Sequence, residues 1–150
     1  MNKIFTILLC AICISVPIFA IPADDSNIEA YRNEYFGKVI PYWEQNGQRG
    51  EFEGKEVVPI AYIKLLAAQE KGAIVILHGK GESSEKYAEL VYDLHLKNPD
   101  FSFYLMDFRG HGRSGRLLGN RYKVQVENFE YYLEDVKKFI AQFKLNNGIK

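Results

Sequence analysis

Residues 73–82 read Ala-Ile-Val-Ile-Leu-His-Gly-Lys-Gly-Glu, and this stretch decides the predicted fold. Residues 73–77 are all apolar and mostly β-branched, which is typical of a strand buried on both faces of a parallel sheet. The chain then turns polar at His78. Because functional groups in such sheets gather at the carboxyl ends of strands, we expect residues 78–84 to form part of a site.

The sequence downstream repeats this pattern. A helix is predicted with Ser83 or Ser84 as its N-cap, ending at Asn98-Pro99-Asp100. Residues 101–106, FSFYLM, form a second apolar strand that leads into a glycine-rich loop, DFRGHGRSG, at 107–115. The order strand, helix, strand predicts a right-handed crossover and a parallel pair.

Two further segments extend the fold. Residues 57–66 are mostly apolar and β-branched and predict another strand. From about Asn128, apolar residues recur at helical spacing and predict a helix whose whole stripe is core. The stripe consists of Phe129, Tyr132, Leu133, Val136, Phe139, Ile140 and Phe143. The predicted fold class is α/β, with a mostly parallel sheet and flanking helices.

The N-terminal part of the sequence predicts a targeting segment followed by a helical lead-in. Residues 1–20 predict a signal peptide, because Lys3 precedes a long uncharged, apolar stretch, and export to the periplasm or exterior is expected. The alternative is a membrane anchor formed by residues 4–20. Residues 21–49 predict a helical lead-in that begins with a capping box at Ser26 and Glu29.

Composition excludes several classes of protein. Lys plus Arg and Asp plus Glu number 19 each, which argues against a nucleic-acid partner. The 47% hydrophobic content is too high for a disordered chain. Cys10 and Cys13 have C-x-x-C spacing, but they lie in an apolar targeting segment, so neither a metal site nor a redox site is expected.

Nucleotide binding is one interpretation of the two loops. Gly79-Lys80-Gly81 follows a strand, as in a dinucleotide-binding G-x-G-x-x-G, but Ser84 occupies the third glycine position. Residues 110–115 match the spacing, yet residues 116–124 separate them from the next helix. A Rossmann-like nucleotide-binding protein therefore stays an alternative. A short exported binding module, whose exposed strand edge pairs with a partner, is another.

Three segments in order carry a resemblance to a known family. They are HGKGESSEKYAELVYDL at 78–94, MDFRGHGRSGR at 106–116 and VENFEYYLEDVKKFI at 126–140. They resemble the lysophospholipase and monoacylglycerol-lipase branch of the α/β-hydrolases, S33-type serine hydrolases. The likeness covers about residues 50–144. It implies hydrolysis of acyl esters of lysophospholipids or monoacylglycerols, with no cofactor and with peripheral membrane contact.

The resemblance also implies roles for particular residues. The N–H of Lys80 would supply half of an oxyanion hole beside His78 and Gly79, and Glu82 would fix this loop. A structural loop beneath the site would consist of Asp107, Arg109, Gly110, Gly112 and Ser114. Phe108 stands where the family often has a basic or polar residue.

From the residue types alone, plainer roles stay open. His78 fits a hydrogen bonder that fixes its loop better than a catalytic base. His95 fits a surface or satisfied histidine, and His111 fits a turn. Asp107 and Arg109 fit a structural ion pair or backbone contacts.

The sequence lacks a nucleophile elbow, G-x-S-x-G. Ser114 follows Gly112 but precedes Arg116 by two residues, and Ser83 fails in the same way. The resemblance places serine, acid and histidine, in that order, after this segment. Asn147-Gly148 predicts a turn and Ile149 the start of a strand, and that strand is expected to carry the nucleophile. Residues 50–150 are therefore expected to be a partial α/β-hydrolase domain that is inactive alone.

Overall fold

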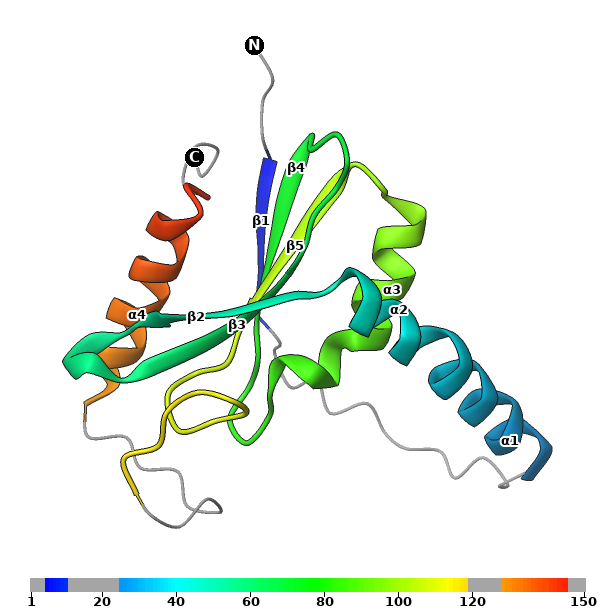
Figure 1. Cartoon of the computed structure of the whole chain (residues 1–150), viewed down its shortest axis with the longest axis horizontal. Coiled ribbons are helices and arrows are strands. Elements are labelled where there is room, and N and C mark those ends of the chain that lie inside the picture. Colours follow the sequence, from blue (N-terminus) through cyan, green and yellow to red (C-terminus); the bar gives the residue numbers. More distant parts are fainter. Residues whose placement is uncertain (1–4, 11–24, 119–127, 146–150) are drawn as a thin grey trace.

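The computed structural model describes residues 5–10, 25–118 and 128–145. A five-stranded sheet lies at its centre, with helices on both faces (Figure 1). The strands are β1 Phe5–Cys10, β2 Gln48–Glu53, β3 Pro59–Leu65, β4 Gly72–Leu77 and β5 Phe101–Met106, in the order β1-β4-β5-β3-β2. The α-helices are α1 Asp25–Glu34, α2 Ile40–Asn46, α3 Ala88–Lys97 and α4 Phe129–Gln142.

The sheet is mixed, so the prediction of a mostly parallel sheet is wrong. β4 runs parallel to β5 and to β1, whereas β3 runs antiparallel to both β5 and β2. Residues 66–71 connect β3 to β4. A crossover between parallel strands needs a dozen or more residues, so this short connection does not return the chain to a parallel direction.

The predicted apolar strands appear where the sequence placed them, as β3, β4 and β5. The sequence does not predict β2, which begins at Gln48 inside the predicted lead-in of residues 21–49. β2 is an edge strand with no buried residue, and it therefore lacks the apolar run that marks β4. Before β2, a π-helical turn, Tyr35–Val39, joins α1 to α2.

Each face of the sheet has its own core, because successive side chains of a strand point to opposite faces. Phe103 and Leu105 of β5 face α2 and α3, where Trp43 is buried. Tyr104 and Met106 face α4. In Figure 1, α4 lies on one side of the sheet and α2 and α3 on the other. β5 is thus buried on both faces, as predicted.

The stripe of α4 is only partly core. Phe129 is 69% and Leu133 48% exposed, so the prediction that both are core is wrong. The buried residues of α4 are Tyr132, Asp135 and Phe139. These three lie at i, i+3 and i+7 on one face, and burial of a carboxylate at its centre turns Leu133 toward solvent.

β1 forms the sheet edge beside β4, with Phe5 opposite Gly72 and Cys10 opposite Leu77. It lies within the predicted signal peptide, residues 1–20. The other residues of that segment, 1–4 and 11–20, lie outside the described residues, as do 119–127 and Ile149. Across the described ranges, no helix is both long and apolar enough to cross a membrane.

Candidate functional site

Two loops meet at one end of the sheet. Residues 78–84 (the β4 loop) follow β4, and residues 107–116 (the β5 loop) follow β5. The parallel register pairs Leu77 with Met106, so both loops begin at the same level. Figure 1 shows them together, in green and yellow, below the strands. The predicted site residues of both loops therefore share one end of the sheet.

Glu82 holds the β4 loop in shape. Its Oε2 accepts hydrogen bonds from the Gly79 N–H at 3.1 Å and from the Tyr87 hydroxyl at 2.8 Å. Its Oε1 is paired with the Lys86 ammonium. The hydrogen bonds from Lys86, Tyr87 and Gly79 lower the pKa of Glu82 to about 2, so the carboxylate is ionised at neutral pH. Through these contacts Glu82 connects the start of the β4 loop to the helical turn that follows it.

His78 joins the two loops. Its Nε2 accepts the N–H of Phe108 at 3.0 Å, which leaves Nδ1 to donate to the Gly79 carbonyl at 2.7 Å. Burial lowers the pKa of His78, which favours this neutral form. Because both ring nitrogens are engaged, His78 acts in this structure as a hydrogen bonder between loops.

Lys80 lies at the open part of the β4 loop. Within the described ranges, its backbone N–H has no hydrogen-bond acceptor. Gly79 and Gly81 flank it, and Gly81 has a φ of 79°, in the left-handed region that glycine adopts without strain. A free N–H in a loop held by Glu82 and His78 can donate to a negatively charged oxygen without rearrangement of the loop.

Asp107 anchors both loops from below. Its Oδ1 accepts the N–H of Ser84 at 2.7 Å, and its Oδ2 accepts the N–H of Arg113 at 2.8 Å. The side chain is buried, and a Cβ on Gly112 would lie 2.1 Å from Oδ2. Gly112 also has a φ of 44°, so both space and backbone require glycine there.

Ser114 ties the β5 loop to β3. Its hydroxyl donates to the Asp107 carbonyl at 2.6 Å and accepts the N–H of Ala61 at 2.9 Å. Ser114 is buried, and its hydroxyl proton is used in this bond. Among the described residues, these contacts include no histidine that could act as a base for a nucleophilic Ser114.

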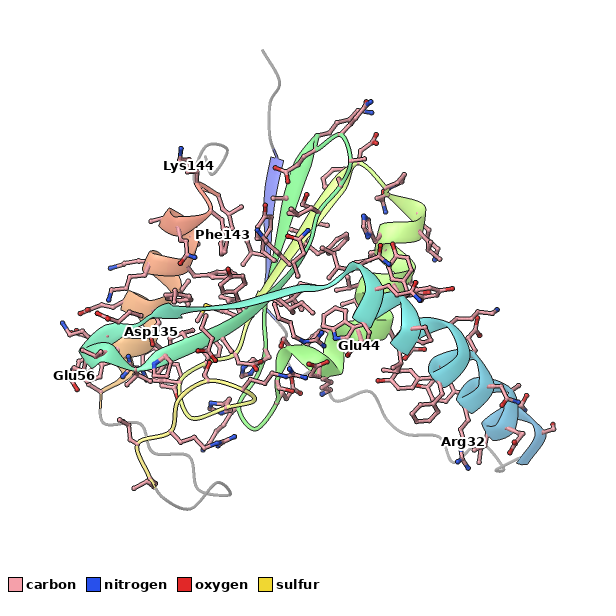
Figure 2. All side chains as sticks on the ribbon, viewed as in Figure 1. Arg32, Glu44, Glu56, Asp135, Phe143 and Lys144 are labelled. Carbon is pink, nitrogen blue, oxygen red and sulfur yellow. The ribbon has the colours of Figure 1, made fainter. Side chains whose placement is uncertain are left out.

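Arg109 pairs with an acid that the sequence reasoning missed. Its Nε and Nη2 lie 2.8 and 3.0 Å from the two carboxylate oxygens of Asp135 on α4. Asp135 also accepts the N–H of Lys55 at 2.7 Å. Figure 2 places Asp135 on the side of α4 next to the β2–β3 hairpin. An acid between Tyr132 and Phe139, inside an apolar stripe, was the signal that could have identified this partner.

The other two histidines have structural surroundings. His95 is buried, its Nδ1 lies 2.9 Å from the Tyr42 hydroxyl, and burial lowers its pKa. The His111 Nδ1 lies 3.0 Å from the Arg109 carbonyl, while its buried Nε2 has no partner among the described residues. These contacts fit the satisfied histidine and the turn residue that the sequence suggested.

The geometry does not suit a dinucleotide. A 3₁₀ turn, Ser84–Tyr87, rather than an α-helix, follows the β4 loop, so no long helix directs its N-terminus at a phosphate there. Asp107 ends the next strand, where a dinucleotide-binding protein holds the ribose with an acid, but both of its oxygens already accept backbone hydrogen bonds. In the described part of the chain, no cluster of three or more His, Cys, Asp or Glu residues could hold a metal ion.

The mixed sheet, the helices on its two faces and the two loops at one end define the α/β-hydrolase class. Solved structures show the same fold. An α/β hydrolase from Novosphingobium aromaticivorans gives a TM-score of 0.51 at 14% identity, over 67% of this chain and 33% of that one. An epoxide hydrolase from Vigna radiata gives 0.52 at 13% identity, over 67% and 30%.

Comparisons of the sequence with known families and proteins identify the family within this fold. The model of the family "Serine aminopeptidase, S33" matches residues 68–150, more than half of the chain, and the chain therefore belongs to this family. Lysophospholipase L2 of Escherichia coli (strain K12) is 37% identical over 107 residues, which are 71% of this chain. The chain spans 30% of that relative's length. The predicted family resemblance is confirmed, and the nucleotide-binding and binding-module alternatives are not favoured.

Proposed function

We propose that this chain forms the oxyanion-hole side of a serine ester hydrolase of the lysophospholipase type. The observation that carries the proposal is the free N–H of Lys80 in a loop fixed by Glu82 and His78. The nucleophilic serine, the acid and the catalytic histidine come from residues outside these 150.

In the proposed reaction, the β4 loop supplies the oxyanion donor and residues outside this chain supply the nucleophile and the base. The serine attacks the ester carbonyl while the histidine takes its proton, and the negative charge that develops on the carbonyl oxygen accepts the Lys80 N–H. When the intermediate collapses, the histidine gives its proton to the leaving alcohol, and the acyl group stays on the serine. Water then hydrolyses this acyl-enzyme and releases the fatty acid. The β4 loop contributes by being rigid before the substrate arrives, because a donor already in place needs no reorganisation during the reaction.

The described residues support a nucleophile from elsewhere. The Ser114 hydroxyl donates to Asp107, and the Ser84 side chain is buried beneath the loop. No serine in the sequence has the G-x-S-x-G context. The 150-residue chain alone therefore turns over no ester above background.

Lysophospholipids and monoacylglycerols are the proposed substrates. A relative that is 37% identical over 107 residues is named a lysophospholipase, and both loops lie within residues 68–150, which match the family model. The apolar N-terminal stretch supports export or membrane anchoring, and such a location would bring the enzyme to lipid surfaces.

The test compares two polypeptides from one gene, the 150-residue chain and the product of the reading frame extended past codon 150. Both are treated with a fluorophosphonate probe and with lysophosphatidylcholine. We expect labelling and hydrolysis only with the extended product, whose new sequence contains G-x-S-x-G, and loss of both when that serine becomes alanine. Labelling of the 150-residue chain, or an extension without such a serine, would contradict the proposal.

A further inference from the structure

A hollow of about 710 Å³ opens between the β4 loop and the β5 loop. Its charged lining side chains are Lys80, Lys86, Arg116 and Glu82. Three cations thus face one carboxylate, although the whole chain has a net charge of zero. The hollow is an electropositive region on a chain whose charges balance overall.

Two of these cations have no carboxylate partner in the described part of the chain. Lys80 makes no ion pair there, and the Arg116 guanidinium donates to the carbonyls of Gly110 and Gly112 instead of to an acid. Lys86 is paired with Glu82, whose other oxygen is held by Tyr87 and the Gly79 N–H. The hollow therefore keeps a net positive charge that an anion can neutralise.

A second pocket on the chain shows the contrast. It has a volume of about 200 Å³, and its charged lining residues are Arg49, Arg113, Glu51, Glu85 and Asp107. Arg49 lies 3.2 Å and Arg113 3.3 Å from the same Glu85 oxygen, and Arg49 also pairs with Glu44. Its charges are satisfied internally, so of these two pockets the hollow is the one suited to an anion.

Lys80 links the hollow to the proposed oxyanion site. Six covalent bonds separate the backbone nitrogen of a lysine from its Nζ, a span of about 7 Å when extended. Six bonds also separate the ester carbonyl carbon of a lysophospholipid from its phosphorus. One residue can therefore hold the carbonyl oxygen with its N–H and contact the phosphate with its ammonium.

We infer that the hollow binds the phosphate of a lysophospholipid head group and so favours lysophospholipids over monoacylglycerols, which carry no phosphate. This inference rests on the proposed function and deepens it. Lys80 and Arg116 are the specificity-determining residues, while Glu82 and the glycines shape the hollow. Charge attraction from exposed cations is modest for each residue and falls with salt, so binding weakens as ionic strength rises.

The binding test uses the ¹⁵N-labelled 150-residue chain and needs no catalytic serine. Titration with sn-glycero-3-phosphocholine and with inorganic phosphate should shift the amides of Lys80, Gly81 and Gly112, whereas glycerol should shift none. Lys80→Gln removes a side chain without a described ion pair, and it should weaken binding about threefold to tenfold. The matched control is Lys71→Gln, which removes another exposed lysine, one that is paired with Asp100, and binding should be unchanged.

Three outcomes of the titration would overturn the head-group site. The first is an affinity of the Lys80→Gln variant equal to that of the wild type, and the second is amide shifts spread over unrelated lysines. Binding of inorganic phosphate with exclusion of glycerophosphocholine would overturn it as well.

The extended product then gives a second readout. The ratio of kcat/KM for lysophosphatidylcholine to kcat/KM for monoacylglycerol should fall in Lys80→Gln and not in Lys71→Gln. An unchanged ratio would overturn the inference and leave the hydrolase proposal standing. No hydrolysis of either ester would contradict the proposed function, whatever the binding result.

Discussion

Arg109 and Asp135 form a two-pronged ion pair in the interior, with the Arg109 side chain 2% exposed and that of Asp135 fully buried. The pair joins the β5 loop to α4. Asp135 also accepts the N–H of Lys55, and Arg109 donates to the Lys55 carbonyl, so the β2–β3 hairpin is held at the same point. Three segments that are distant in sequence thus depend on one carboxylate.

Replacing Asp135 with asparagine should lower the free energy of unfolding by about 3–5 kcal/mol, because it leaves the Arg109 charge buried without a counterion. The control is Glu134→Gln on the same helix. Glu134 pairs with Lys55 at 3.1 Å, but both side chains are about 40% exposed, so its loss should cost less than about 1 kcal/mol. Urea denaturation measures both, and equal losses would contradict a special role for Asp135.

Gly112→Ala should destabilise the chain by about 2–4 kcal/mol. The left-handed backbone costs an alanine about 1–2 kcal/mol, and displacement of the Asp107 carboxylate weakens its bond to the Arg113 N–H. Gly37→Ala is the matched control, since a Cβ there meets nothing within 4 Å in a helical turn. It should leave stability unchanged or raise it by up to about 1 kcal/mol. A Gly112 variant as stable as the Gly37 variant would disprove the close approach.

Much of the sheet could be predicted from sequence, for a physical reason. Residues 73–77 and 101–106 are apolar without alternation, and only a strand covered on both faces buries every residue of such a run. The loops after these strands carry His78 and Asp107, so the position of the site followed from the strands. The polar edge strand β2 has no such run, and its existence depends on pairing with β3.

Other features depend on contacts that no local pattern contains. Asp135 lies within the apolar stripe of α4, but its partner Arg109 is 26 residues away in the sequence, and no local pattern indicates which cation it pairs with. The exposure of Leu133 follows from that pair. The direction of β3 was available in principle, since residues 66–71 are too few for a parallel crossover.

His78 should titrate below its ordinary value of 6.5, because burial lowers its pKa. A group whose pKa is lowered by folding contributes stability that is present above the unfolded pKa and is lost as the pH falls through the folded one. The chain should therefore lose stability below about pH 6.5, and His78→Gln should flatten part of this dependence. NMR titration of the imidazole checks the pKa and the predicted Nδ1–H form, and a pKa of 6.5 or above would contradict the structure.

Glu82 should affect the stability of the chain at lower pH than His78 does. Its ordinary pKa is 4.5 and its folded value about 2, so its contribution is full above pH 4.5 and disappears as the pH falls toward 2. Glu82→Gln should lower the melting temperature at pH 7 and remove part of the decline between pH 4.5 and 2. If the variant and the wild type lose stability in parallel over this range, Glu82 does not hold the loop through its charge.

The central claim is that the Lys80 N–H stabilises an oxyanion, and replacing that N–H by oxygen tests it most directly. In the product of the extended reading frame, the Gly79–Lys80 amide is converted to an ester by incorporation of the α-hydroxy analogue of lysine, which keeps the side chain. We predict that kcat for lysophosphatidylcholine falls about 100-fold to 1,000-fold with little change in KM. The same replacement at Gly81 is the control and should have a much smaller effect. A kcat that survives the Lys80 replacement, or that falls equally with both, would contradict the account.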